Sequence, residues 1–173
     1  MAESVYIGLG SNLENPVEQI KAAVVALKQI PETQYIADSG LYLSKPLLID
    51  DVESDDQDDY YNAVALLDTR LEPLVLLDYL QAIENNQGRI REQRWAARTL
   101  DLDMLMYAQL QMNKARLILP HPGICVREFV LYPLHRLCQK MQQPDLNIPG
   151  HGTLNKIINS CSENELKYVG EIV

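Results

Sequence analysis

Two acidic residues inside an apolar run are the side chains of this sequence best placed to do chemistry. Asp101 and Asp103 occupy alternate positions of the run 100–107, and the period of two predicts a β-strand whose opposite face carries Met104 and Met106. Both carboxylates then project from one face, roughly 7 Å apart along the strand. Neighbouring carboxylates on a mostly buried strand repel each other and are costly to desolvate, so they need cations. Mg²⁺ fits the pair, because it prefers oxygen ligands and is usually held by one or two carboxylates together with substrate phosphates.

The segment just before the aspartates is basic. Its arginines are Arg89, Arg91, Arg94 and Arg98, in a chain that is acidic elsewhere. Because arginine is a common partner of phosphate oxygens, a flexible arginine segment next to a metal-binding pair suits a nucleotide. The alternative is that the aspartates lie on a solvated face of the strand, or pair with Arg94 and Arg98. The spacing alone leaves both interpretations open.

Charge and composition narrow the classes of protein. The 173 residues suit one domain, over 1–173, with a substantial core. A net charge of −9 and a pI of 4.7 argue against a non-specific nucleic-acid binder, but they allow a nucleotide substrate beside local arginines. The three cysteines are odd in number and widely spaced, which indicates reduced thiols. The N-terminus has no signal-peptide pattern, and no apolar run approaches about 18 residues. We therefore expect a cytoplasmic monomer without membrane contact.

Hydrophobic periodicity and turn residues predict the order of the elements. Asn15 followed by Pro16 predicts a capped helix start, Pro31 stops that helix, and Gly88 stops the second one. Gly10 and the two residues after it are predicted to form the turn that ends the first strand. The predicted strands are 5–10, 35–43, 60–67, 100–107 and 116–119, and the other predicted helices are 72–87, 127–138 and a short one within 150–161.

The order strand, helix, strand, strand, helix, strand predicts the fold class. It is typical of an α+β protein, a ferredoxin-like β-α-β-β-α-β sandwich with an antiparallel sheet and helices on one face. The other face is free to carry a site and is partly covered by a C-terminal extension. Because this frame also hosts RNA-binding and ligand-sensing modules, the fold does not decide the function.

An acidic run separates two of the predicted strands. Seven of the ten residues in 50–59 are Asp or Glu, so we expect a solvated loop. Either this loop has no role, or its charges attract the arginine segment before a nucleotide arrives and slow the approach of the nucleotide by repulsion.

Three further polar residues are candidates for binding. Gln81 and Glu84 lie three apart, on one side of the second predicted helix. His121 lies between Pro120 and Pro122, which hold it in a rigid extended turn. A purely structural role for this histidine is the alternative.

Five motifs, in order along nearly the whole chain, resemble the 6-hydroxymethyl-7,8-dihydropterin pyrophosphokinase family of folate biosynthesis. The central one, 94–105, is the most specific. The motifs are Gly10-Ser11-Asn12, Tyr60-Tyr61-Asn62-Ala63, Gln81-x-x-Glu84-x-x-x-Gly88-Arg89-x-Arg91, Arg94-Trp95-Ala96-Ala97-Arg98-Thr99-Leu100-Asp101-Leu102-Asp103-Met104-Leu105, and Pro120-His121-Pro122 followed by Arg127-x-Phe129.

The resemblance implies an enzyme that transfers a pyrophosphoryl group from ATP, its co-substrate, to the hydroxymethyl oxygen of a pterin, leaving AMP. It implies that Asp101 and Asp103 hold two Mg²⁺ ions and, with Arg89 and Arg98, form the catalytic set. The implied ATP-binding residues are Gln81, Glu84, Arg89, Arg91, Trp95, Arg98, Arg116, His121 and Arg127, and the implied pterin-binding residues are Ser44, Leu47, Tyr60, Asn62, Trp95 and Phe129.

Some positions depart from the family pattern, although none of them touches the aspartate pair. Ala96 and Ala97 stand where the family often has Gly-Pro, and Lys45 and Leu48 replace commoner residues near the pterin edge. Two other function classes remain as hypotheses. One is a non-catalytic ferredoxin-like ligand-binding module, and the other is a different Mg²⁺-dependent nucleotide transferase on the same frame.

Overall fold

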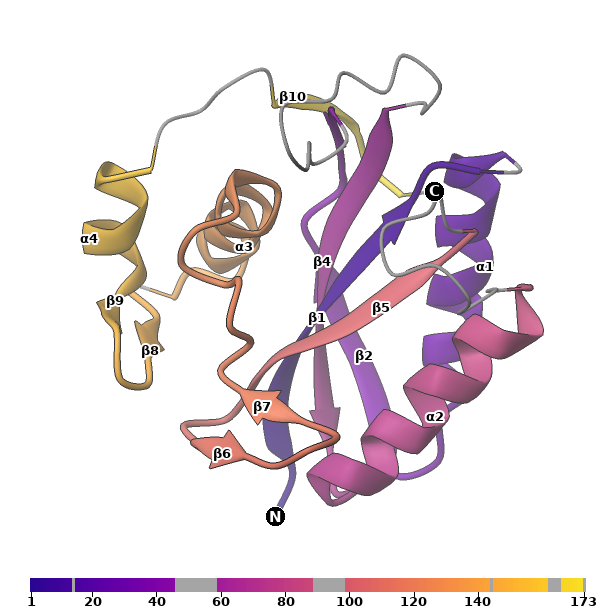
Figure 1. The fold of residues 1–173 in the computed structure, drawn as a ribbon, viewed down its shortest axis with the longest axis horizontal. Coiled ribbons are helices and arrows are strands. Elements are labelled where there is room, and N and C mark those ends of the chain that lie inside the picture. Colours follow the sequence, from indigo (N-terminus) through magenta and orange to yellow (C-terminus); the bar gives the residue numbers. More distant parts are fainter. Residues whose placement is uncertain (14, 46–58, 89–98, 144, 162–165, 173) are drawn as a thin grey trace.

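The computed structural model of the chain describes residues 1–13, 15–45, 59–88, 99–143, 145–161 and 166–172 (Figure 1). Its helices and strands, in chain order, are β1 (Glu3–Ser11), α1 (Pro16–Leu27), β2 (Thr33–Asp38), β3 (Leu41–Ser44), β4 (Tyr60–Thr69), α2 (Pro73–Asn86), β5 (Asp101–Tyr107), β6 (Met112–Asn113), β7 (Ile118–Leu119), α3 (Glu128–Lys140), β8 (Asn147–Ile148), β9 (Gly152–Thr153), α4 (Leu154–Asn159) and β10 (Lys167–Gly170). The main sheet is antiparallel and runs in the order β10-β3-β4-β1-β5. β2 and β3 pair with successive parts of one edge of β4.

Helices cover both faces of this sheet. α1 and α2 pack on one face, against β1 and β5, and α3 packs on the other, mainly against β4 (Figure 1). Alternate residues of a strand therefore enter two separate cores: Ile7 lies in the core under α1 and α2, and Tyr6 lies in the core under α3. The architecture is α+β, and the C-terminal part of the chain covers the second face through α3 and α4.

The first two helices form where the apolar period predicted them. Ile20 in α1 and Leu80 in α2 are fully buried. Gly88, just after α2, has a φ of 84°, a left-handed conformation that glycine adopts without a steric penalty. The prediction for Asn15 was wrong in one respect. Its φ is 59°, a left-handed conformation in place of the extended one of a usual N-cap, and its side chain makes no capping hydrogen bond to the described part of the helix. Its backbone carbonyl still accepts the Gln19 N–H, the first hydrogen bond of the helix.

The predicted strand 35–43 is two strands, so that prediction was wrong. β2 ends at Asp38 and β3 begins at Leu41, because the chain turns at Ser39 and Gly40. Gly40 has a φ of 77°, and its N–H donates to Oδ1 of Asp38 at 2.9 Å. The turn allows two short strands to pair with one long neighbour.

β5 also departs from strict alternation. Its register with β1 shifts by one residue between Met104 and Met106, which leaves Leu105 as the additional residue of a β-bulge. Met106 therefore enters the core under α3 and does not share the core of Met104, as alternation predicted. Because the bulge follows Asp103, the two aspartates still share one face.

The remaining elements are short or were not predicted. β10 adds to the free edge of β3 and has no counterpart among the predicted strands. The predicted strand 116–119 shortens to Ile118–Leu119, which pairs with β6. α3 continues through Pro133 to Lys140. Among the helices that the structure describes, none combines the length and the apolar character needed to cross a bilayer.

Candidate active site

Residues of three neighbouring strands meet in one row. Gly10 of β1 pairs with Asn62 of β4 on one side and with Asp101 of β5 on the other. Directly paired residues of antiparallel strands project from the same face, so the Asn62 and Asp101 side chains share a face. Asp103, two residues along β5, shares it too. The face is the one that α3 covers, because Val64, two residues beyond Asn62, enters the core under α3.

β1 contributes no side chain between the amide and the carboxylates, because Gly8 and Gly10 occupy its positions on this face. The backbone does not require glycine at position 10. Its φ lies outside the left-handed range, and an added Cβ would make only ordinary contact, 3.6 Å from Oδ1 of Asn62. A longer side chain would project between Asn62 and Asp101. Glycine inside a strand often marks the close approach of a ligand. The prediction that Gly10 begins a turn was wrong, since β1 continues to Ser11.

Asn62 is the centre of a buried polar group. Its amide nitrogen donates to Oγ of Ser44 at 2.7 Å and to the Tyr60 carbonyl at 3.3 Å. Both amide hydrogens are thereby used, which leaves the carboxamide oxygen as the atom that Asn62 offers. Ser44 and Tyr60 are directly paired across β3 and β4. The structure therefore brings together three of the residues predicted to bind the pterin.

Two buried contacts fix the start of β5, where the aspartates lie. Oγ of Ser11 donates to the Thr99 carbonyl. Oε1 of Glu84, from α2, accepts the Leu102 N–H at 2.8 Å, and Glu84 is only 2% exposed. This hydrogen bond holds the backbone midway between Asp101 and Asp103. Glu84 was predicted from the resemblance to lie beside a nucleotide, and the structure adds this direct contact with the strand of the aspartates.

His121 faces the second aspartate. Its Nε2 lies 3.9 Å from Oδ2 of Asp103, and the Gly123 N–H donates to its Nδ1 at 2.9 Å. Because Nδ1 accepts, the neutral imidazole carries its proton on Nε2, toward Asp103. Burial lowers the pKa of His121, and the nearby Arg127 guanidinium lowers it further. His121 is therefore a neutral hydrogen-bond donor near pH 7.

Arg127 lies over the turn that holds His121. Its side chain passes so close to Gly123 that a Cβ there would lie 2.5 Å from Nε. The guanidinium carbon lies 5.9 Å from the centre of the Phe129 ring. The structure thus brings His121, Arg127 and Phe129 together. Gly123 was missed in the sequence, where the Pro-Gly pair that follows His121 was the available signal.

Arg116 and Gln81 meet on the side of α2. Arg116, from the loop between β6 and β7, donates through Nη2 to Oδ1 of Asp78 at 2.5 Å and to Oε1 of Gln81 at 3.3 Å. The Arg116 and Asp78 side chains are 49% and 62% exposed, so a ligand can reach both. Gln81 and Arg116, both among the residues predicted to bind ATP, are therefore neighbours, and Asp78 is an acidic partner that no sequence pattern singled out.

The aspartate pair fits a Mg²⁺ ion whose remaining coordination positions are filled by substrate and water. In the part of the chain that the structure describes, no three His, Cys, Asp or Glu residues gather closely enough to hold a metal by themselves. Two carboxylates on one face, with the other positions left to substrate and water, match the usual coordination of Mg²⁺. Most of the acidic run, 50–58, lies outside the described residues, and so do five of the predicted site residues: Leu47, Arg89, Arg91, Trp95 and Arg98.

A family model matches most of the chain. The model for 7,8-dihydro-6-hydroxymethylpterin-pyrophosphokinase matches residues 6–139. Two curated relatives are both named 2-amino-4-hydroxy-6-hydroxymethyldihydropteridine pyrophosphokinase. The protein from Pseudomonas aeruginosa is 47% identical over 161 residues, which are 93% of each chain. The protein from Haemophilus influenzae is 42% identical over 163 residues, which are 94% of this chain and 96% of the relative.

Solved structures share the fold at much lower identity. Wild-type Plasmodium falciparum HPPK-DHPS, crystallised with pteroate, superposes with a TM-score of 0.67 and 14% identity, over 92% of this chain. The chain spans 44% of that longer protein. A likeness at this identity concerns the architecture, and it agrees with the α+β arrangement described above.

Proposed function

This chain belongs to the 7,8-dihydro-6-hydroxymethylpterin-pyrophosphokinase family, and from that premise we propose how its residues hold the two substrates. The reaction transfers a pyrophosphoryl group from ATP to the hydroxymethyl group of the dihydropterin in folate synthesis. The row of Asn62, Gly10 and Asp101 carries the proposal, because it places a buried amide and a carboxylate on one face with no side chain between them. The pterin lies on the Asn62 side of this row and the triphosphate on the Asp101 side.

Pterin recognition begins with Asn62. A pterin presents N–H donors along one edge of its ring, and the carboxamide oxygen of Asn62 is an acceptor held in place by Ser44 and Tyr60. Phe129 is half-buried beside the core under α3 and offers an aromatic face for a flat ring. Leu47 and Trp95 complete the proposed set of pterin contacts.

Asp101 and Asp103 are proposed to hold two Mg²⁺ ions with the triphosphate. Bound there, Mg²⁺ supplies charge neutralisation and polarises the attacked phosphorus. The Nε2–H of His121, which lies near Asp103, and the guanidinium of Arg127, which lies near His121, are proposed to donate hydrogen bonds to phosphate oxygens. Glu84 keeps the backbone of β5 in position. Gln81 and Arg116, together with Arg89, Arg91 and Arg98, make the remaining proposed contacts with ATP.

The chemical step is an in-line displacement. The hydroxymethyl oxygen of the pterin bonds to the β-phosphorus of ATP and loses its proton to solvent, the bond from that phosphorus to the α–β bridging oxygen breaks, and AMP leaves. Such transfers need mainly positioning and electrostatic stabilisation from the protein. The proposed substrate sites lie on either side of Gly10, and this arrangement supplies the positioning.

The fold subclass, the domain organisation, the oligomeric state and the cellular compartment are also part of the proposal. The strand order β2-β4-β1-β5, with α1 and α2 on one face, supports a ferredoxin-like sandwich. We expect a single domain over 1–173 that acts as a cytoplasmic monomer on small-molecule substrates. The three cysteines are free thiols, which supports a reducing compartment.

Product analysis tests this function. Purified protein incubated with ATP, the pterin alcohol and Mg²⁺ should form AMP and the pterin diphosphate in equal amounts, and a chelator should abolish both. Pterin-dependent ADP would identify an ordinary kinase instead. Pterin binding without turnover would favour the non-catalytic module, and turnover only with another acceptor would favour a different nucleotide transferase.

A further inference from the structure

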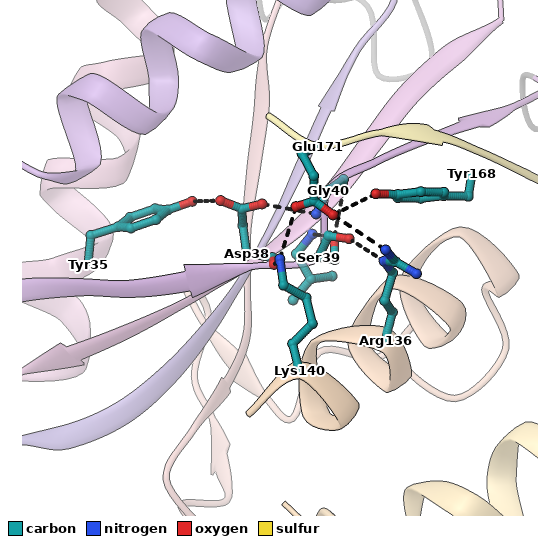
Figure 2. Close-up of polar contacts among 9 residues, drawn as sticks. Tyr35, Asp38, Ser39, Gly40, Arg136, Lys140, Tyr168 and Glu171 are labelled. Atoms are coloured by element: carbon teal, nitrogen blue, oxygen red, sulfur yellow. Dashed lines mark hydrogen bonds and ion pairs between the residues drawn. The ribbon is translucent and has the colours of Figure 1, made fainter. Parts of the chain in front are cut away.

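A network of side chains fixes the segment 167–172, which we call the clasp, to the rest of the protein (Figure 2). Glu171 accepts hydrogen bonds from the Tyr168 hydroxyl at 2.6 Å, from Nζ of Lys140 at 3.0 Å and from Nη2 of Arg136 at 3.3 Å. Lys140 and Arg136 belong to α3, so one carboxylate joins the clasp to that helix. Beyond it, Ile172 packs against the core under α1 and α2.

The same two cations bind the turn between β2 and β3 (Figure 2). Nε of Arg136 donates to the Ser39 carbonyl at 3.1 Å, and Nζ of Lys140 donates to the Asp38 carbonyl at 2.9 Å. A Cβ added at Gly40 would lie only 2.8 Å from the Gly170 carbonyl oxygen. The clasp therefore lies directly against the start of β3, at a distance that only glycine permits.

Tyr168 connects the clasp to the strand that precedes the proposed pterin residues. Its ring lies 3.9 Å below the Arg136 guanidinium and 5.4 Å from the Tyr42 ring, in an edge-on arrangement. Tyr168 also pairs with Tyr42 across β10 and β3, and Tyr42 in turn pairs with Asn62 across β3 and β4. Two steps of strand pairing thus separate the clasp from the amide that we assign to the pterin.

β3 needs such support. It has four residues and pairs with β4 at only three positions, Tyr42, Leu43 and Ser44, so its own hydrogen bonds hold it weakly. Ser44, at its end, accepts the hydrogen bond that orients Asn62. A displacement of β3 from β4 moves Ser44 and removes the shorter of the two hydrogen bonds that orient the Asn62 carboxamide.

The geometry points to the clasp as a positioning element for the pterin: by holding β3 against β4 it keeps Ser44 and Asn62 oriented for binding. This inference rests on the proposed function. It predicts a larger effect on the pterin than on ATP, because β5, which carries the two aspartates, is separated from β3 in the sheet by β4 and β1. Arg127, also proposed to bind ATP, lies at the opposite end of α3 from Arg136 and Lys140, and α3 itself packs against β4. Tyr168 and Glu171 are positioning residues that need not touch either substrate.

Binding measurements on full-length variants test the inference. Calorimetry gives the Kd of the pterin alcohol at saturating Mg²⁺ and saturating ATP analogue with an uncleavable α–β bridge, and the Kd of that analogue alone. We expect Glu171→Gln to raise the pterin Kd about threefold and Tyr168→Ala about tenfold, with the analogue Kd within about twofold of the parent. Tyr35→Phe is the control, because it removes a hydrogen bond to Asp38 in the same network without touching the clasp.

The possible results distinguish a failure of this inference from a failure of the proposed function. Unchanged pterin affinity in Tyr168→Ala, with a parent protein that binds the pterin, overturns the inference and leaves the proposed function intact. Equal weakening of both ligands also overturns it, because that pattern indicates a general loss of structure. A parent protein that does not bind the pterin overturns the proposed function itself. A variant that is partly unfolded at equilibrium raises the apparent Kd of both ligands by the same factor, so the Kd of the analogue identifies that case.

Discussion

At the scale of single residues, Gly10 separates the two halves of the site without contributing a side chain. Asn62 and Asp101 flank it in register, and its backbone conformation is one that any residue adopts. Space is therefore the physical reason for a glycine at this position. The acids, the amide and His121 act through their own functional groups, whereas Gly10 acts by leaving room.

Substitutions of graded size at Gly10 test this role. Gly10→Ala should keep kcat/KM for the pterin within about threefold, because its methyl would make ordinary contact with Asn62. Gly10→Leu should lower it by about tenfold or more, since the longer side chain would lie between the substrates. Steady-state kinetics and thermal unfolding of both variants give the comparison. Parent-like activity of a folded Gly10→Leu variant would show that the space is not used.

We expect Asp78 to compete with ATP for Arg116. The two side chains form an exposed ion pair at 2.5 Å, and we propose that Arg116 contacts ATP. Asp78→Asn should lower the Kd of ATP by about two- to fivefold at low salt, with a smaller effect at high salt, because exposed charges are screened. Titration of both proteins with the ATP analogue that has an uncleavable α–β bridge, at two salt concentrations, measures this change in Kd. Asp68→Asn is the matched control, because it alters an acid of β4 that accepts a hydrogen bond from Ser4 of β1. A higher Kd for Asp78→Asn would mean that Asp78 instead helps to orient Arg116.

At the scale of elements, the short strands are held by contacts distant in sequence. β3 is flanked by β4 and by β10, and Glu171, just after β10, binds Arg136 and Lys140 of α3. The turn before β3 requires Gly40 because Gly170 lies against it. Neither β10 nor this turn was predicted, since the loose alternation of 35–43 indicated a single strand and the restriction comes from residues about 130 positions later.

The ion pairs of the clasp predict a pH-dependent stability. Hydrogen bonds from Tyr168, Lys140 and Arg136 lower the pKa of Glu171 from 4.5 to about 2. Because the folded-state pKa is the lower one, this stabilisation is present above pH 4.5 and is lost as the pH falls toward 2. Glu171 is half-exposed, so solvent screening limits the contribution to about 1 kcal/mol or less. Urea unfolding should show Glu171→Gln less stable than the parent at pH 7, with a difference that shrinks between pH 4.5 and pH 3. A difference that is constant with pH would contradict the role of the charge.

At the scale of the whole molecule, the predictable features are those with local causes. β1, α1, β4, α2, β5 and α3 follow from apolar periods, and Pro16 and Gly88 mark two helix ends correctly. Asp101 and Asp103 share a face as predicted, because the β-bulge at Leu105 follows them. The clustering of Asn62 with Ser44, and of His121 with Arg127, could be expected only from the family resemblance.

The features that were missed depend on how distant segments pair. The role of Gly10 requires the registers of β1 with both β4 and β5, and no single segment contains that information. The same holds for Glu84, whose hydrogen bond to Leu102 joins a helix to a strand that lies 18 residues later in the sequence. Sequence periodicity gives the face of each strand, but only the assembled sheet shows which residues of different strands are neighbours.

We propose that the two aspartates of β5 carry the transfer while the pterin residues of β3 and β4 bind independently of them. Pterin-dependent AMP formation by Asp101→Asn and Asp103→Asn, at saturating Mg²⁺, tests it most directly, with Asp68→Asn as the control. Both variants should unfold at the temperature of the parent or above it, because one of two repelling carboxylates has been neutralised. Turnover should fall by about 100-fold or more while the Kd of the pterin stays within a few-fold. A folded asparagine variant that retains near-parental turnover would contradict the account.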